Sequence, residues 1–172
     1  YLASESFGSP FLMQDFCRTI CKESSIEYKM PKPQHLSLTF ESVSNIFPII
    51  ADNSGRSMFD KLKRGPTSRT DRKPRTLKNG EVTDIYGVVM DAFKHLKPGT
   101  ETITYDTLRA NIREVIADDL PQRSEISRVL EKIAEISYSD TSSTPVIDWQ
   151  KEDDILTVTD PFFAFYLRWS TN

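Results

Sequence analysis

The chain has 172 residues, with 22 Lys or Arg, 25 Asp or Glu and a formal net charge of −3. This length fits one or two small domains, and the ordinary apolar content excludes a disordered chain. No apolar run approaches the roughly 20 residues that cross a bilayer. We therefore expect no membrane contact and, without a signal peptide, a cytoplasmic protein. Cys17 and Cys21 are expected to be buried free thiols of a reducing compartment.

The first thirty residues predict a helix, a break and a second helix. Residues 7–10, Phe-Gly-Ser-Pro, form the break. Ser9 can accept hydrogen bonds from the free amides of the next helix, and the fixed φ of Pro10 suits a first helical turn. Apolar residues then recur at helical spacing on one face: Leu12, Met13, Phe16, Cys17 and Ile20.

A third helix is predicted to begin at Thr39, whose hydroxyl can cap it. Pro48 is expected either to kink this helix or to split it in two. Residues 52–55, Asp-Asn-Ser-Gly, are expected to end it, because these residue types favour turns. Met58, Phe59 and Leu62 indicate one more short helix.

Residues 61–78 are strongly basic, with eight Lys or Arg against the single acidic residue Asp71. Gly65, Pro66 and Pro74 argue against regular structure here. We therefore predict a linker over residues 61–80, between one domain at 1–60 and another at 81–172. The first 80 residues carry +5 and the remaining residues −8. The basic residues are Lys61, Lys63, Arg64, Arg69, Arg72, Lys73, Arg75 and Lys78.

The second half predicts a regular order of short elements. The apolar spacing of residues 82–96 indicates a helix that stops before Pro98. A short strand over 103–105 precedes two helices, over 108–116 and from Pro121 to 136. Alternation indicates strands over 146–149 and 155–158, followed by an aromatic helix that ends near Trp169. This is the order of a winged helix-turn-helix domain, in a chain that is mainly α with a small β hairpin.

Two segments resemble ATPases of the AAA+ and STAND kind. Residues 160–169, Asp-Pro-Phe-Phe-Ala-Phe-Tyr-Leu-Arg-Trp, resemble the end of their winged helix, where an Asp-Pro cap begins an aromatic helix. Residues 6–11, Ser-Phe-Gly-Ser-Pro-Phe, resemble the Gly-x-Pro element of the helical lid that follows their nucleotide-binding domain. The resemblance implies a helical lid subdomain over residues 1–60, in which Gly8 and Pro10 contact the adenine side of the nucleotide.

The sequence departs from these ATPases in one important respect. It has no Gly-x-x-x-x-Gly-Lys-Ser/Thr phosphate loop and no strand that ends in acidic residues for Mg²⁺. The resemblance therefore implies an upstream ATPase domain, with ATP or ADP and Mg²⁺ bound by the full-length protein. This chain would be its non-catalytic C-terminal part, with no catalytic residue and no metal ligand. The alternative is a free-standing winged-helix regulator that binds DNA.

The helix from Pro121 would be the one that enters a major groove. Gln122, Arg123, Ser127 and Arg128 could then contact bases or a protein partner. The acidic residues 152–154 at the expected wing tip would repel phosphates, so we favour contact with a partner or with the protein's own ATPase domain. The basic linker is the better candidate for any DNA contact indifferent to sequence, through Arg69, Arg72, Lys73 and Arg75.

Overall fold

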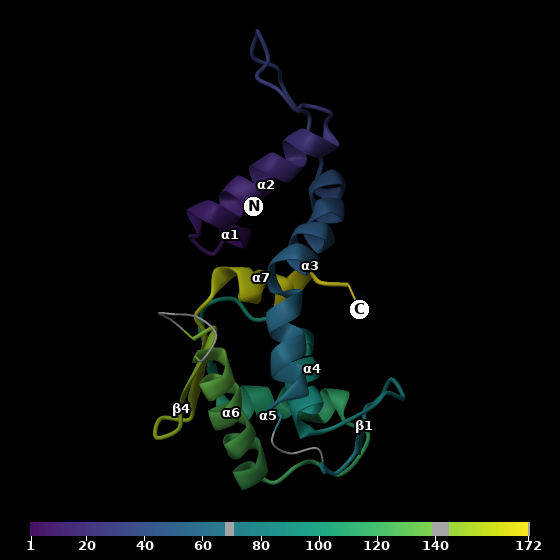
Figure 1. Cartoon of the computed structure of the whole chain (residues 1–172), viewed down its shortest axis with the longest axis vertical. Coiled ribbons are helices and arrows are strands. Elements are labelled where there is room, and N and C mark those ends of the chain that lie inside the picture. Colours follow the sequence, from purple (N-terminus) through teal and green to yellow (C-terminus); the bar gives the residue numbers. More distant parts are fainter. Residues whose placement is uncertain (68–70, 139–144, 172) are drawn as a thin grey trace.

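The computed structural model describes residues 1–67, 71–138 and 145–171 (Figure 1). These residues are mainly helical, with one antiparallel sheet of two strands and another of three. The helices are α1 (Leu2–Glu5), α2 (Pro10–Glu23), α3 (Phe40–Arg64), α4 (Ile85–Leu96), α5 (Tyr105–Val115), α6 (Arg123–Tyr138) and α7 (Pro161–Trp169). The strands are β1 (Arg75–Thr76), β2 (Val82–Thr83), β3 (Thr102–Thr104), β4 (Ile147–Gln150) and β5 (Ile155–Val158).

Residues 1–51, which we call the arm, project from residues 56–158, which we call the body (Figure 1). Within the arm, α2 lies against the first half of α3, and residues 24–39 form an extended connection at its tip. The predicted break before α2 is confirmed, because Ser9 caps the helix and Pro10 is its first residue. The prediction of two buried thiols is wrong, because Cys17 is exposed on α2 and Cys21 is only half-buried.

Helix α3 is continuous from Phe40 to Arg64, so the predicted end at residues 52–55 is wrong. It begins at a capping box in which Thr39 and Ser42 satisfy each other's backbone amides. Turn-forming residue types do not stop it, because Ala51, Phe59 and Leu62 are buried on one continuous face. Gly55 allows α7 to approach closely there: a Cβ atom at this position would lie 2.2 Å from the Tyr166 Cβ.

Helix α7 packs between the arm and the body, and its aromatic residues contact both. On the arm side, the Phe165 ring lies 5.0 Å from Phe16 and 5.2 Å from Phe47 between ring centroids. On the body side, the Tyr166 ring lies 5.3 Å from the Phe59 ring. The hydrophobic core is therefore one cluster that continues through α7 from arm to body.

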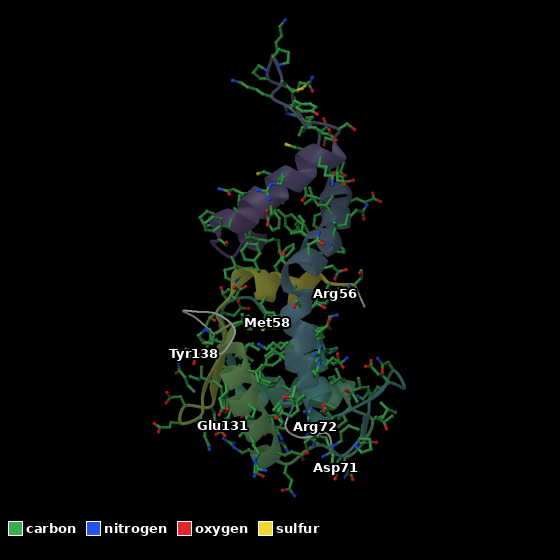
Figure 2. The ribbon with its side chains drawn as sticks, viewed as in Figure 1. Arg56, Met58, Asp71, Arg72, Glu131 and Tyr138 are labelled. Carbon is green, nitrogen blue, oxygen red and sulfur yellow. The ribbon has the colours of Figure 1, made fainter. Side chains whose placement is uncertain are left out.

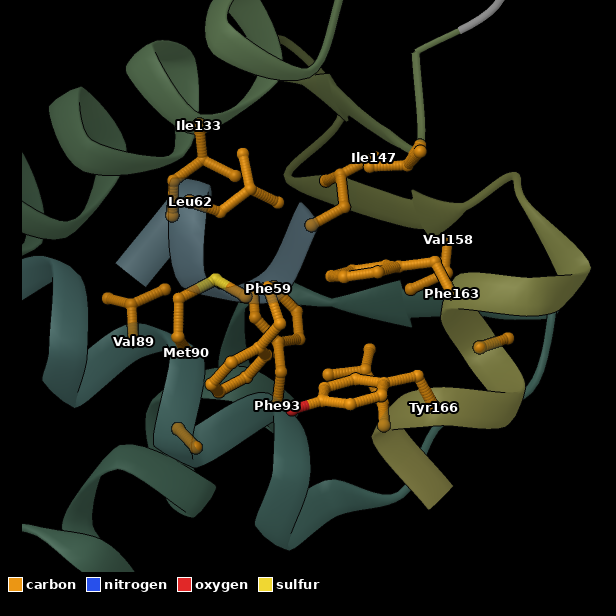
Figure 3. Packing of buried hydrophobic residues seen from close by; sticks show 14 of the residues in the cluster. Phe59, Leu62, Val89, Met90, Phe93, Ile133, Ile147, Val158, Phe163 and Tyr166 are labelled. Carbon is orange, nitrogen blue, oxygen red and sulfur yellow. The ribbon is translucent and has the colours of Figure 1, made fainter. Parts of the chain in front are cut away.

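The body contains α4, α5 and α6 packed with a sheet of strand order β3-β5-β4. Its core joins apolar side chains from the helices and the inner face of the sheet, as Figure 3 shows for Met90, Ile133, Ile147 and Val158. The predicted short strand and the predicted hairpin are confirmed. Helix α4 begins later than predicted, because Asp84 caps it and Val82 belongs to β2.

Both ends of the predicted linker are ordered parts of the body. Residues 61–64 form the last turn of α3, and Leu62 is fully buried. Strand β1 pairs with β2, and the segment after it runs along the end of α5. There the Lys78 amide donates to the Val115 carbonyl at 2.8 Å, and the Ala117 amide to the Thr76 carbonyl at 2.9 Å. The boundary predicted at residue 60 thus falls inside α3, and the one at residue 80 falls in the turn between the paired strands β1 and β2.

Candidate functional site

The turn between α1 and α2 is the segment that resembles a nucleotide-contacting element. Phe7 and Gly8 both adopt positive φ, at 47° and 73°. The Ser9 hydroxyl accepts a hydrogen bond from the Leu12 amide at 3.3 Å, and Pro10 occupies the first helical position. Gly8, Pro10 and the neighbouring Phe11 are exposed. The turn therefore presents a solvent-facing surface of Gly8, Pro10 and Phe11.

The buried side of this turn is tied to the end of α7. Glu5 is 7% exposed, and its carboxylate accepts a hydrogen bond from the Trp169 indole at 2.7 Å and contacts Arg168 at 3.4 Å. The Arg168 guanidinium also lies 4.9 Å from the centroid of the Phe7 ring. A displacement of the turn would therefore disturb the contacts that Arg168 and Trp169 make at the end of α7.

Gly8 and Pro10, the residues predicted to contact adenine, lie together on the exposed side of this turn. A flat exposed Pro and a Gly with open space beside its α-carbon can pack against a planar base. Among residues 1–67, 71–138 and 145–171, no group of three His, Cys, Asp or Glu side chains could hold a metal ion.

The basic residues of the predicted linker differ in burial and in the partners that they contact. Arg72 pairs with Asp84, donates to the Arg64 carbonyl at 2.7 Å and lies 4.7 Å from the Tyr86 ring centroid. Arg72 thus closes the loop that follows α3. Arg75 is only 6% exposed. Its two contacts with the Glu125 carboxylate, at 2.9 and 3.0 Å, connect β1 to α6.

The linker therefore offers less positive charge to a phosphate backbone than its sequence indicates. Arg72 and Arg75 have their charges matched inside the fold, and Lys73 is exposed. Arg69 lies outside the described residues. These pairings could not be predicted from nearby residues, because the partners Asp84 and Glu125 lie 12 and 50 residues away.

The exposed side of α6 is joined to the β4–β5 turn by ion pairs. Arg123 pairs with Asp154 and lies 4.7 Å from the Tyr105 ring centroid. Glu131, labelled in Figure 2, accepts from Lys151 at 2.7 Å. These pairs hold the turn against the helix that was predicted to enter a DNA groove. Of the other predicted contact residues, Gln122 and Arg128 are exposed and Ser127 is half-buried.

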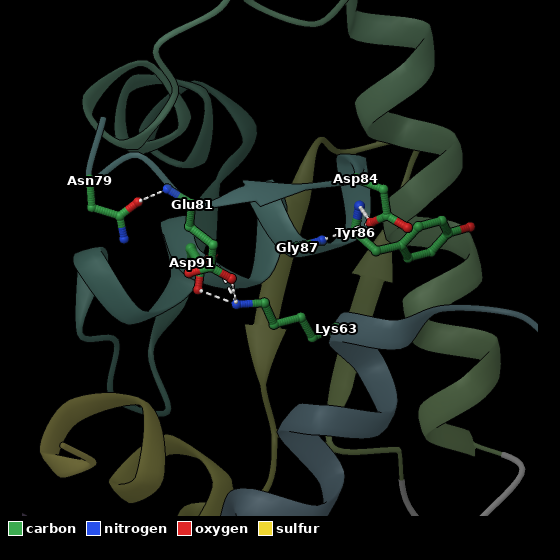
Figure 4. A network of polar contacts seen from close by, with 7 residues as sticks. All are labelled: Lys63, Asn79, Glu81, Asp84, Tyr86, Gly87 and Asp91. Carbon is green, nitrogen blue, oxygen red and sulfur yellow. Dashed lines mark hydrogen bonds and ion pairs between the residues drawn. The ribbon is translucent and has the colours of Figure 1, made fainter. Parts of the chain in front are cut away.

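A cleft of about 700 Å³ opens beside the C-terminal end of α4. Of its lining residues, only Lys63 and Lys78 belong to a predicted site, the basic linker; the others come from separate segments. One wall contains Lys63, which contacts Glu81 at 3.1 Å and Asp91 at 3.2 Å (Figure 4). The lining also includes Lys78, Lys94, His95, Lys97, Glu114 and Arg168, together with the apolar residues Phe59, Leu77, Val115 and Leu167.

Burial shifts the pKa values of three charged side chains that line the cleft. Burial raises the pKa of Asp91, and the nearby Lys63 ammonium only partly offsets this effect. For Lys63 burial acts to lower the pKa, but Asp91 and Glu81 outweigh it and the pKa is raised. Burial lowers the pKa of Lys94, whose ammonium lies 5.2 Å from the Phe59 ring centroid. The charged form of Lys94 is thus less well stabilised than that of an exposed lysine.

Comparison of the chain with protein-family models, with curated proteins and with solved structures found no match. Within the described parts of the chain, no helix is both long and apolar enough to cross a membrane.

Proposed function

We propose that this chain is the non-catalytic C-terminal part of an AAA+ or STAND-like ATPase. In this proposal the arm is a nucleotide-sensing lid, and the body with α7 is a winged helix that passes the nucleotide state to a protein partner. The order α4-β3-α5-α6-β4-β5 and the strand order β3-β5-β4 support the winged-helix assignment.

The observation that carries the proposal is the continuous packing that connects the two parts. A single helix, α3, runs through arm and body, and α7 packs along it at the close approach of Gly55 and Tyr166. The turn at Gly8 contacts α7 through Glu5 and Phe7. Because α7 contacts both this turn and the body, a ligand that shifts the turn would disturb the packing of α7 on the body.

Charge and pairing favour a protein partner over DNA. Residues 81–172 carry −8, and residues 152–154 at the β4–β5 turn are acidic. Arg123 is already paired with Asp154. Since neutralisation of phosphates supplies most non-specific DNA affinity, this surface is poorly suited to a duplex.

The test is nucleotide affinity in the full-length protein. Pro10→Ala should weaken binding of ATP and ADP by about 1–2 kcal/mol, because packing is lost and the start of α2 loosens. A titration with a fluorescent nucleotide analogue measures the change. Pro33→Ala, in the exposed connection at residues 24–39, is the matched control and should leave affinity unchanged.

A second readout tests the relay. Hydrogen exchange of α6 and the β3-β5-β4 sheet should differ between the ATP and ADP states of the full-length protein, and Pro10→Ala should reduce that difference. Unchanged affinity in Pro10→Ala would leave residues 8–10 as an ordinary helix start and remove the support for a lid.

A further inference from the structure

Three sulfur-containing side chains lie in one row along α2. Met13, Cys17 and Cys21 follow one another at intervals of four residues in a helix that is continuous from Pro10 to Glu23. Residues at this interval are neighbours on a helix surface, with about 5–6 Å between their Cβ atoms. Both cysteines are free thiols. We call these three side chains the sulfur row, and from their juxtaposition we infer that it binds a soft metal ion of low coordination number, Cu(I), through the two cysteine sulfurs.

The exposure of the sulfur row separates it from the core of the arm. Cys17 is exposed, and Met13 and Cys21 are half-buried. A free cysteine is usually among the most buried residues of a protein, where it packs as a small apolar side chain. Packing therefore does not account for the position of Cys17, and an ion in solution can reach the row.

The neighbouring row of α2 holds the sulfur row in place. Leu12, Phe16 and Ile20 each precede a sulfur-containing residue by one position, and all three are buried in the hydrophobic core. The end of the helix is fixed as well, because the Cys21 carbonyl accepts a hydrogen bond from the Ile26 amide at 2.8 Å. The two thiols therefore project from a packed helix at a fixed spacing, at the edge of its buried face.

The spacing of the two thiols suits a bridging ion and not a disulfide. A disulfide requires Cβ atoms about 3.5–4.5 Å apart, which is closer than two residues four apart on a helix. A bridging ion instead inserts two metal–sulfur bonds, each about 2.3 Å long when the metal is zinc. Each thiol releases its proton to solvent as the ion binds, because the thiolate is the ligand. The Met13 thioether carries no such proton and can add a third, weaker sulfur ligand.

The small number of ligands favours Cu(I) over zinc. Zinc in structural sites is almost always held by four ligands. Over residues 1–67, 71–138 and 145–171, no His, Asp or Glu joins the two thiols to form a set of three. Two or three sulfur ligands satisfy Cu(I), and thiolate and thioether sulfurs are the ligands that select it. This assignment departs from the sequence-based prediction of no metal ligand, and it is independent of the proposed nucleotide coupling.

The experiment uses the chain itself, reduced and free of metal, with Cu(I) supplied as its coloured complex with bicinchoninate. Loss of the colour measures the transfer of copper to the protein, and we expect one Cu(I) per chain. Cys17→Ser and Cys21→Ser, each alone, should lower the affinity by about a hundredfold or more, because only one thiolate remains. Met13→Leu, which conserves volume, should lower it by only about tenfold. Met30→Leu, at an exposed position of the arm, is the matched control and should leave the affinity unchanged.

The affinity for Cu(I) should also fall as the pH is lowered, because protons compete with the ion for both thiolates. No transfer of copper to the unmodified chain would overturn the inference. Retained affinity in either Cys→Ser variant would do the same, since a single thiol would then account for the binding. Cys17 is exposed, so Cys17→Ser tests the site with the least effect on folding, which circular dichroism checks for each variant.

Two further measurements test the kind of site. If an equimolar amount of Zn²⁺ displaces Cu(I) from the protein, the site is a zinc site and the Cu(I) assignment is wrong. Size-exclusion chromatography compares the chain with and without Cu(I). A monomer in both conditions supports a site built on one helix, whereas a Cu(I)-dependent dimer that holds one ion per two chains would overturn it.

Discussion

At the scale of single residues, Gly55 sets how closely α3 and α7 can pack. Gly55→Ala would place its Cβ 2.2 Å from the Tyr166 Cβ, and rotation of a side chain cannot relieve an overlap between two Cβ atoms. The helices must separate, so we expect a loss of about 1–3 kcal/mol in the free energy of unfolding. The higher helix propensity of Ala than of Gly offsets at most about 1 kcal/mol of this loss.

Urea unfolding followed by circular dichroism measures the effect of Gly55→Ala. Ser57→Ala, at an exposed position of the same helix, is the control and should change stability by less than about 0.5 kcal/mol. A stabilised Gly55→Ala variant would show that α7 can move away from α3 without cost.

Arg75 shows why a basic residue in the sequence need not be available to a ligand. Arg75→Ala removes a buried guanidinium from its two contacts with Glu125, whose side chain is 36% exposed. Because Glu125 can be partly rehydrated, we expect a loss of about 1–3 kcal/mol rather than the full cost of an orphaned buried charge. Lys73→Ala, two residues earlier and exposed, should stay within about 0.5 kcal/mol in the same urea assay. Equal effects of the two substitutions would contradict a structural role for Arg75.

At the scale of elements, features fixed by nearby residues could be predicted from the sequence. The caps at Ser9 and Thr39 and the strands β4 and β5 depend on hydroxyls and alternation within a few residues. The continuity of α3 could not be predicted, because packing against α7 overrides the turn propensity of residues 52–55. The cleft could not be predicted either, because its lining residues are brought together only by the tertiary fold.

Helix α7 is the element that joins the arm to the body, and Phe165 is one of its buried contacts with the arm. Phe165→Ala should cost about 3–5 kcal/mol, because a fully buried ring between Phe16 and Phe47 is replaced by a cavity. We expect hydrogen exchange to rise most in α2 and in residues 40–51, while β3, β4 and β5 stay protected. Phe162→Ala, on the same helix at a half-buried position, is the control and should produce a smaller, uniform change. Equal increases in arm and body would show that the two parts unfold as one unit.

At the scale of the whole molecule, the charge distribution decides which macromolecules can approach. The positive charge of the first 80 residues is partly neutralised by internal ion pairs, such as Arg72 with Asp84 and Arg75 with Glu125. The acidic second half keeps exposed carboxylates at Glu152 and Asp153. The sequence alone indicated a basic linker able to hold DNA, and the tertiary pairings remove much of that capacity.

We therefore expect binding to duplex DNA to be weak, indifferent to base sequence and steeply reduced by salt. Fluorescence anisotropy with a labelled duplex of random sequence, over a salt series, measures it. Lys73→Ala with Lys78→Ala removes two exposed charges and should reduce the residual binding. Arg123→Ala with Arg128→Ala should change it less, because Arg123 is already paired with Asp154. If instead the Arg123 and Arg128 variant loses binding while the lysine variant keeps it, α6 reads DNA directly, and the free-standing DNA-binding regulator becomes the better account of this chain.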